Sequence, residues 1–314
     1  NGVSATIGLD DPTVFNRTVV GNLSVGLPAA GTGLPVNAYG GTHAPDIVGN
    51  IRVDQAWGLF QISGMAHLVN ASYNILTAGT GLPNNLSEIS GHPDDKWGGA
   101  VMAALQIKNL PTGAGDDIKI DVSYAKGATK SVISTSGASP TFLMFGNTGV
   151  PGAYQSVGLG LTTDAIYSGG LGGGATQGLK LTEAWGIRGA FNHNWDPYWS
   201  SSLWGSYAAV RYNGDVLDGT SAKGAFCNAF NTTNTLKSVD YACNPDYNIA
   251  QVGVVTRWTP VKNLTFSGEV GAFFLDQKFG GSAVLTAPAP KPTARYEFRD
   301  QSTVFLNLRV QRNF

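Results

Sequence analysis

The sequence predicts an all-β fold, a transmembrane antiparallel β-barrel, and three observations lead to this prediction. Apolar and polar residues alternate strictly in about ten segments. The connections between these segments alternate between short and long, and only 13 % of the 314 residues are charged, about half of the usual share. Residues 1–314 are expected to form a single β-barrel domain.

The alternation is clearest in residues 117–124, where Ile118, Ile120 and Val122 alternate with polar residues. A period of two places these apolar side chains on one face of a β-strand and the polar ones on the other. Each segment is close to the roughly ten residues that a tilted transmembrane strand requires. The other expected strands are 3–9, 47–54, 60–68, 97–108, 185–192, 203–212, 251–258, 264–274 and 303–314, and the facing of 203–212 is not clear from the pattern.

The connections follow a regular order of lengths. Short ones are expected at 55–56, 110–115, 194–198 and 260–263, and long ones at 10–46, 71–95, 127–181, 214–246 and 276–300. Outer-membrane barrels alternate short periplasmic turns with long extracellular loops in this way, whereas a soluble sandwich has no reason to do so. No stretch reaches the roughly 18 apolar residues that a membrane-spanning helix needs.

The polar faces of the expected strands carry charged residues. A dry core would require a partner for each charge, whereas a water-filled lumen would solvate it. The alternative is an ordinary solvent-facing sheet surface, but nothing evident would then cover the opposite face, which is rich in Trp, Phe and Gly. The expected pore-lining residues are Asn50, Arg52, Asp54, Lys119, Asp121, Arg188, Arg257, Glu269 and Arg309.

Aromatic residues gather near the ends of the expected strands. Rings at both membrane–water boundaries would produce this pattern, and ordinary core residues are the alternative for any single one. The residues are Trp57, Trp97, Trp185, Trp195, Tyr198, Trp199, Trp258 and Phe314.

Other chemistry has little support in the sequence. Cys227 and Cys243 are expected to form a disulfide that closes a short loop. Two sulfurs do not complete a zinc site, so no metal is expected, and the glycine-rich run 169–174 lacks a phosphate-binding motif, so no cofactor is expected. The net charge of −1 gives no reason to expect a nucleic-acid partner.

No catalytic residues are expected, although an enzyme built inside the barrel is an alternative. The four histidines are scattered along the chain, and only one falls on an expected inner face. A catalytic dyad would require a Ser or Asp within hydrogen-bond reach of one of them. The histidines are His43, His67, His92 and His193.

Several segments resemble one known family. The chain ends on an alternating strand and Phe314, which resembles the assembly signal of bacterial outer-membrane proteins. Residues 45–58, 243–247, 257–265 and 310–314 resemble the alphaproteobacterial porin family found in rhizobia and brucellae.

The resemblance implies a sixteen-stranded porin, usually a homotrimer, in the outer membrane of a Gram-negative bacterium. Small hydrophilic solutes and ions would diffuse passively through it, with outer-membrane lipid and lipopolysaccharide as further partners. Family members begin with further strands and an inward-folded constriction loop, which do not appear here, so the chain is expected to be the C-terminal part of a longer porin. The alternatives are a barrel enzyme of the protease or phospholipase type and a secreted all-β adhesin.

Overall fold

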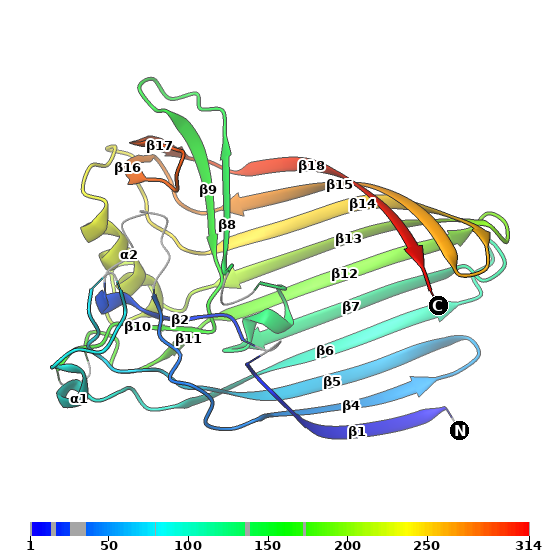
Figure 1. Cartoon of the computed structure of the whole chain (residues 1–314), viewed down its shortest axis with the longest axis horizontal. Coiled ribbons are helices and arrows are strands. Elements are labelled where there is room, and N and C mark those ends of the chain that lie inside the picture. The colour runs from blue at the N-terminus through cyan, green and yellow to red at the C-terminus, as the bar shows by residue number, and fades with distance from the viewer. Residues whose placement is uncertain are drawn as a thin grey trace.

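A computed structural model describes residues 2–13, 17–25, 36–78, 80–135, 139–171 and 174–313. Its main feature is one antiparallel sheet of ten strands, each paired with the next long strand along the chain (Figure 1). The strands are β1 (Val3–Asp10), β4 (Asp46–Asp54), β5 (Gly58–Val69), β6 (Lys96–Lys108), β7 (Asp117–Lys126), β12 (Glu183–Asn194), β13 (Trp199–Arg211), β14 (Tyr247–Val261), β15 (Leu264–Gln277) and β18 (Gln301–Arg312).

The ten strands coincide with the ten segments that the alternation predicted, so this prediction is confirmed. The short turns all lie at one end of the sheet and the long loops at the other end (Figure 1). The predicted order of connection lengths is therefore also confirmed.

The long loops contain secondary structure that the sequence did not predict. Two small sheets of four strands form at the loop end, in the orders β11-β10-β2-β3 and β16-β17-β9-β8. Their strands are β2 (Val20–Asn22), β3 (Val36–Asn37), β8 (Thr141–Gly146), β9 (Gln155–Leu161), β10 (Ala165–Tyr167), β11 (Lys180–Leu181), β16 (Ser282–Thr286) and β17 (Thr293–Phe298). The helices are η1 (Leu23–Val25), α1 (Ser87–Ser90), η2 (Thr129–Ser131) and α2 (Ala222–Thr233).

The ten-stranded sheet is open along β1 and β18. Among the described residues, each of these two strands pairs with one neighbour only. A closed barrel and the sixteen strands of the family therefore remain predictions.

The two faces of the sheet differ in polarity. One face, here called the outer face, is apolar and exposed. Ile7 and Leu308, for example, are 82 % and 79 % accessible to solvent. Burying such a side chain stabilises a soluble protein by roughly 1.5–3 kcal/mol of folding free energy, so a soluble sheet would bury this face. The exposed side chains are Val3, Ile7, Leu9, Ile47, Ile51, Phe60, Ile62, Val101, Ile118, Ile120, Val122, Leu203, Val252, Val254, Val270, Val304, Leu306, Leu308 and Val310.

Exposed aromatic rings gather near the two ends of the long strands, and their role as membrane girdles stays a prediction. Trp97 and Trp185 lie near the loop end, and Trp57, Trp195, Tyr198, Trp199 and Trp258 lie at the short-turn end. Trp185 and Trp195 are ten positions apart, which at ~3.3 Å per residue and a tilt of ~40° separates the two groups by about 25 Å. That distance equals the usual height of the apolar band of an outer-membrane barrel.

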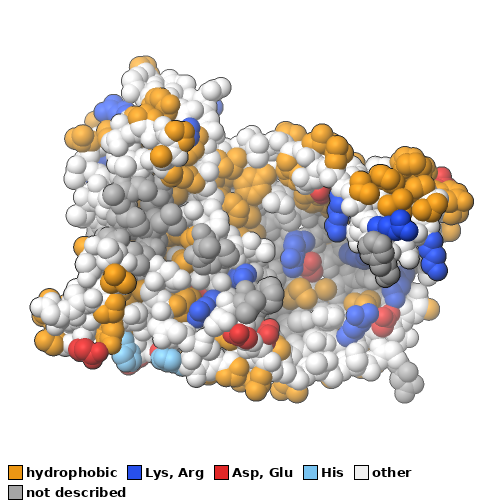
Figure 2. Space-filling model, viewed as in Figure 1, with side chains coloured by type: hydrophobic (Ala, Val, Ile, Leu, Met, Phe, Trp, Pro, Cys, Tyr) orange, Lys and Arg blue, Asp and Glu red, His pale blue; other side chains and the backbone are white. Residues whose placement is uncertain are grey.

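The opposite, inner face is packed only near the loop end. There, Ala184, Val210 and Tyr247 of the wall are buried against Leu159 and Ile166 of the loops. Toward the short turns the inner face is hollow, and charged side chains are visible inside this hollow (Figure 2). The inner face is thus open to solvent near the short turns and covered by the loops at the loop end.

No helix among the described residues is both long enough and apolar enough to cross a membrane.

Helix α2 is held to the loop that follows it. Cys227 and Cys243 form the predicted disulfide, with their Cα atoms 5.8 Å apart. Phe226 and Phe230 of the same helix pack against Phe279. The covalent link and the aromatic cluster together fix residues 222–246 at the mouth of the sheet.

Candidate functional site

All nine predicted pore-lining residues lie on the inner face. The strand registers place Arg52 beside Gln61, Arg188 beside Asp121, and Glu269 beside Asn307, always opposite in facing to the exposed apolar residues. The side chains of Arg52, Lys119 and Arg188 are 46 %, 54 % and 50 % accessible. These charges are therefore hydrated and not enclosed in a dry core.

On strands β4 and β6, two cations surround one carboxylate. Arg52 Nη2 donates to Asp54 Oδ2 at 2.9 Å, and Lys108 Nζ donates to Asp54 Oδ1 at 2.6 Å. Exposed pairs of this kind stabilise a fold by only about 0–1 kcal/mol. Their main effect is to fix the position of charge on the wall.

Strands β7 and β12 carry a second group of charges. Arg188 pairs with Asp121 at 2.9 Å, and Lys119 pairs with Asp117 at 3.2 Å. The amides of Gln106 and Asn192 also donate to Asp117. Donors from the neighbouring strands β6 and β12 therefore surround the Asp117 carboxylate.

Arg257 of β14 and Arg309 of β18 form no ion pair with a carboxylate among the described residues. Arg257 Nη1 donates to Ser202 Oγ at 2.7 Å, and Arg309 lies opposite Ser267 in the register. The nearby carboxylate of Glu269 accepts from the Asn307 amide at 3.1 Å. This side of the wall therefore presents guanidinium groups that are not neutralised by direct ion pairs.

Sequence reasoning omitted several polar residues of this surface. Lys108, Asp117 and Ser202 all follow from the same period of two, because they occupy the parity of the residues that were named. Phe314, predicted as the assembly signal, lies outside the described residues.

The segment 128–135, which contains η2, folds back against the inner face. Ser131 Oγ donates to Met65 Sδ at 3.0 Å, and Met65 lies on the inner face of β5. A Cβ added to Gly186 of β12 would lie 3.1 Å from Val132, so this segment touches the wall on two separate strands. It lies over part of the inner face of the sheet, and sequence reasoning did not find it.

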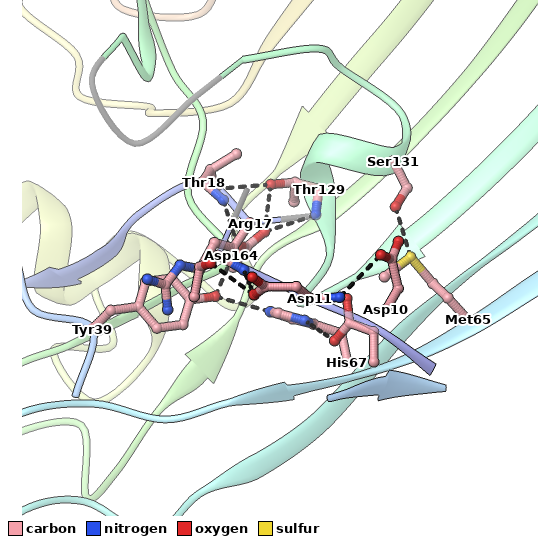
Figure 3. Close-up of polar contacts among 12 residues, drawn as sticks. Asp10, Asp11, Arg17, Thr18, Tyr39, Met65, His67, Thr129, Ser131 and Asp164 are labelled. Carbon is pink, nitrogen blue, oxygen red and sulfur yellow. Dashed lines mark hydrogen bonds and ion pairs between the residues drawn. The ribbon is translucent and has the colours of Figure 1, made fainter. Parts of the chain in front are cut away.

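A buried carboxylate holds this segment in place. Asp164 is fully buried, and its Oδ1 accepts bonds from Thr129 N at 2.8 Å and Thr129 Oγ1 at 3.0 Å. Its Oδ2 accepts from Thr18 N at 2.7 Å and from Tyr39 Oη at 2.9 Å (Figure 3). Several accepted hydrogen bonds offset the free-energy cost of removing a carboxylate from water. Asp164 thus joins three loop segments at one point.

Tyr39 and His67 connect this point to the wall. His67 Nε2 lies 3.0 Å from Tyr39 Oη, and His67 Nδ1 lies 2.7 Å from Asp46 Oδ1 (Figure 3). Burial, followed by the nearby Asp164 carboxylate, raises the pKa of Tyr39 well above its ordinary value. The phenol therefore stays protonated and can donate to Asp164.

Three of the four histidines lie within hydrogen-bond reach of an Asp, and none of the four bonds a serine or threonine nucleophile among the described residues. His43, His67 and His193 contact carboxylates, and His92 contacts a backbone carbonyl. In the described part of the chain, no histidine ring nitrogen bonds a Ser or Thr hydroxyl. Nor do three or more His, Cys, Asp or Glu residues gather there as metal ligands.

An antiparallel sheet with an apolar outer face and a charged inner face has the polarity of a transmembrane β-barrel wall, the reverse of a soluble sheet. The sequence profile of the porin subfamily matches residues 1–306, and the chain belongs to this family.

Among solved structures, the chain is similar to the outer membrane channel DcaP of Acinetobacter baumannii, with 10 % identity and a TM-score of 0.48. The match covers 98 % of this chain and 59 % of that one. No curated protein sequence matches the chain.

Proposed function

We propose that this protein is a porin, a water-filled channel of a Gram-negative outer membrane through which small hydrophilic solutes and ions diffuse passively. The observation that carries the proposal is the inverted polarity of the ten-stranded sheet, together with membership of the porin subfamily. Hydrated charges along the inner face and an apolar outer face suit a wall between water and lipid.

The channel would filter solutes by size and charge. The inward-folded segment 128–135 restricts the width, and the inner wall carries charges of both signs, the pore-lining residues named above. Because many of these charges are paired, we propose weak ion selectivity, set mainly by Arg257 and Arg309, which form no ion pair with any described residue.

We propose that further strands close the sheet along β1 and β18. Unpaired backbone N–H and C=O groups on a sheet edge are costly in lipid, which is why membrane-spanning sheets close on themselves. The resemblance to sixteen-stranded porins supports this. The intact mass of the native subunit tests it, because a subunit of the mass of 314 residues would contradict strands supplied by the same polypeptide.

A homotrimeric assembly and contacts with outer-membrane lipid and lipopolysaccharide complete the proposal. The exposed apolar band and the two groups of exposed aromatic rings support contact with lipid. Native mass spectrometry of the detergent-extracted protein tests the trimer, and a monomeric mass would contradict it.

Recording from planar bilayers tests the channel function. The proposal predicts stepwise, ohmic increases in conductance as single molecules insert. A protein that stays electrically silent and remains soluble without detergent would contradict the porin proposal and favour a secreted β-protein.

A further inference from the structure

Four residues on neighbouring strands form one straight row across the inner face. Trp204 of β13 pairs with Gly253 of β14, Gly253 pairs with Gly271 of β15, and Gly271 pairs with Phe305 of β18. Residues directly opposite in a sheet face the same way. Gly253 and Arg257 share their facing on β14, so the whole row lies on the inner wall.

The two glycines allow the two rings to lie flat on the wall. A Cβ at Gly253 would lie 2.5 Å from Trp204 Cζ2, and a Cβ at Gly271 would lie 2.4 Å from Phe305 Cζ. Neither distance is possible in a real structure, so each ring occupies the space directly above a glycine backbone. The ring centroids are 6.3 Å apart and the planes differ by 27°, so the two rings lie close together and nearly parallel.

Packing does not account for this pair. Both rings are half-buried, with one face on the wall, and neither belongs to the hydrophobic core that the loops form with the wall. Trp204 Nε1 is shielded and has no hydrogen-bond partner among the described residues. A shielded donor without a partner costs about 1–3 kcal/mol, so this position of the indole is not optimised for stability.

Polar groups border the aromatic pair on both sides. The next row toward the short turns holds Ser202, Val255, Glu269 and Asn307, and the next row toward the loops holds Ser206, Gln251, Phe273 and Thr303. Hydroxyl and amide side chains both donate and accept hydrogen bonds. Arg257 reaches the same border through its bond to Ser202.

We propose that Trp204 and Phe305 form a binding subsite for a small saccharide inside the channel, an inference that rests on the proposed porin function. The C–H face of a sugar ring stacks on the aromatic surface, and its hydroxyls exchange hydrogen bonds with the bordering serine, threonine and amide groups. Flat apolar surfaces with a few placed polar groups are the usual composition of small-molecule sites. A planar aromatic anion would use the rings and Arg257 but would leave the hydroxyl and amide groups of the border unused and would lie close to the Glu269 carboxylate.

The test is block of the open channel by maltotriose in planar bilayers, compared between wild type and single variants. Wild type is expected to show a concentration-dependent reduction of current. Trp204→Ala and Phe305→Ala are each expected to raise the apparent Kd roughly three- to tenfold, and Trp204→Phe is expected to retain most of the block. Trp185→Ala is the matched control, because Trp185 lies on the outer face, and it should leave the block unchanged.

A second pair of variants moves the ring without removing it. Gly253→Ala is expected to displace the Trp204 ring and weaken the block, whereas Gly205→Ala adds the same methyl group where the nearest atom is 3.5 Å away and should not. This comparison shows whether the block depends on the position of the Trp204 ring and not only on the presence of an indole at residue 204.

The outcomes distinguish this inference from the porin proposal. Normal conductance with no sugar block, or with a block that Trp204→Ala and Phe305→Ala leave unchanged, overturns the subsite and leaves the porin standing. Block by benzoate but not by maltotriose overturns the saccharide assignment. A wild-type protein without any conductance overturns the porin proposal and the subsite with it.

Discussion

The phenol of Tyr39 donates a hydrogen bond of 2.9 Å to the buried carboxylate of Asp164, and this bond joins the loops to the wall. On one side of the bond, Asp164 holds Thr129 of the inward-folded segment. On the other side, Tyr39 contacts His67 of β5. The position of the inward-folded segment therefore depends on a small set of buried polar contacts.

Replacing Asp164 should release the inward-folded segment. Asp164→Asn keeps the size of the side chain but removes the charge that strengthens its four accepted bonds, and we expect a local loss of about 3 kcal/mol. Hydrogen exchange should show amide protection in 128–135 reduced by about 100-fold, since ~1.4 kcal/mol corresponds to tenfold. Asp240→Asn, in an exposed loop position, is the control. Equal protection in both variants would show that Asp164 does not hold this segment.

Removing the Tyr39 hydroxyl should have a smaller effect of the same kind. Tyr39→Phe leaves His67 and Asp164 each without one buried partner, and we expect a loss of about 1–2 kcal/mol in thermal or denaturant unfolding. Tyr73→Phe is a matched control, because the Tyr73 hydroxyl donates to Glu88 at an exposed position. A change at Tyr73 as large as that at Tyr39 would contradict a special role for the buried contact.

Charge reversal on the inner wall should change ion selectivity. Arg257→Glu and Arg52→Glu are both expected to shift the reversal potential in a salt gradient toward cations. The shift should be larger for Arg257, because Arg52 is already paired with Asp54, whereas Arg257 bonds a serine hydroxyl and no carboxylate in the part of the chain that the structure describes. Arg312→Glu, on the outer face, serves as the control. Unchanged reversal potentials for the two inner variants would mean that these side chains do not line the channel.

The turn between β6 and β7 should confer a dependence of stability on pH. Hydrogen bonds from the backbone N–H of Asn194, first, and from Thr112 and His193 together lower the pKa of Asp116 to about 2. A carboxyl whose pKa is lowered by folding stabilises the fold above its unfolded pKa of about 3.9, and this contribution is lost as the pH falls toward 2. Melting curves of wild type should therefore fall between pH 4 and pH 2.

Asp116→Asn provides the comparison for this effect. The variant should be less stable than wild type at pH 7, and the difference between the two should shrink as the pH falls through the same range. A difference that stays constant from pH 7 to pH 2 would show that the Asp116 charge is not responsible.

The strands were predictable from the sequence because the alternation that identifies each strand lies within that strand's own residues. Alternation places Ile120 outside and Asp121 inside without knowledge of any other segment, and the same rule found all ten long strands. The facing of 203–212 was ambiguous because Trp204 puts a large ring on the polar face. The register with Gly253 explains it, and that pairing joins positions 49 residues apart in the chain.

The loop structure could not be predicted in this way. Asp164 contacts Thr129 of its own long loop and Thr18 and Tyr39 of the loop between β1 and β4, and no local pattern brings these residues together. The same holds for the parallel pairing of β9 with β17, which joins two loops far apart in sequence. These contacts form only after the sheet has brought the loop ends close to one another.

Two neighbouring residues test directly whether the sheet faces lipid with one side and water with the other. The described residues contain no free cysteine, so Ile120→Cys and Asp121→Cys each introduce one defined label site. In reconstituted bilayers, a fluorophore at position 120 should be quenched by nitroxide-labelled lipid, and a cysteine at position 121 should react with a charged, water-soluble thiol reagent. Rapid aqueous reaction at position 120 with no lipid quenching there would contradict the inverted polarity on which the channel depends.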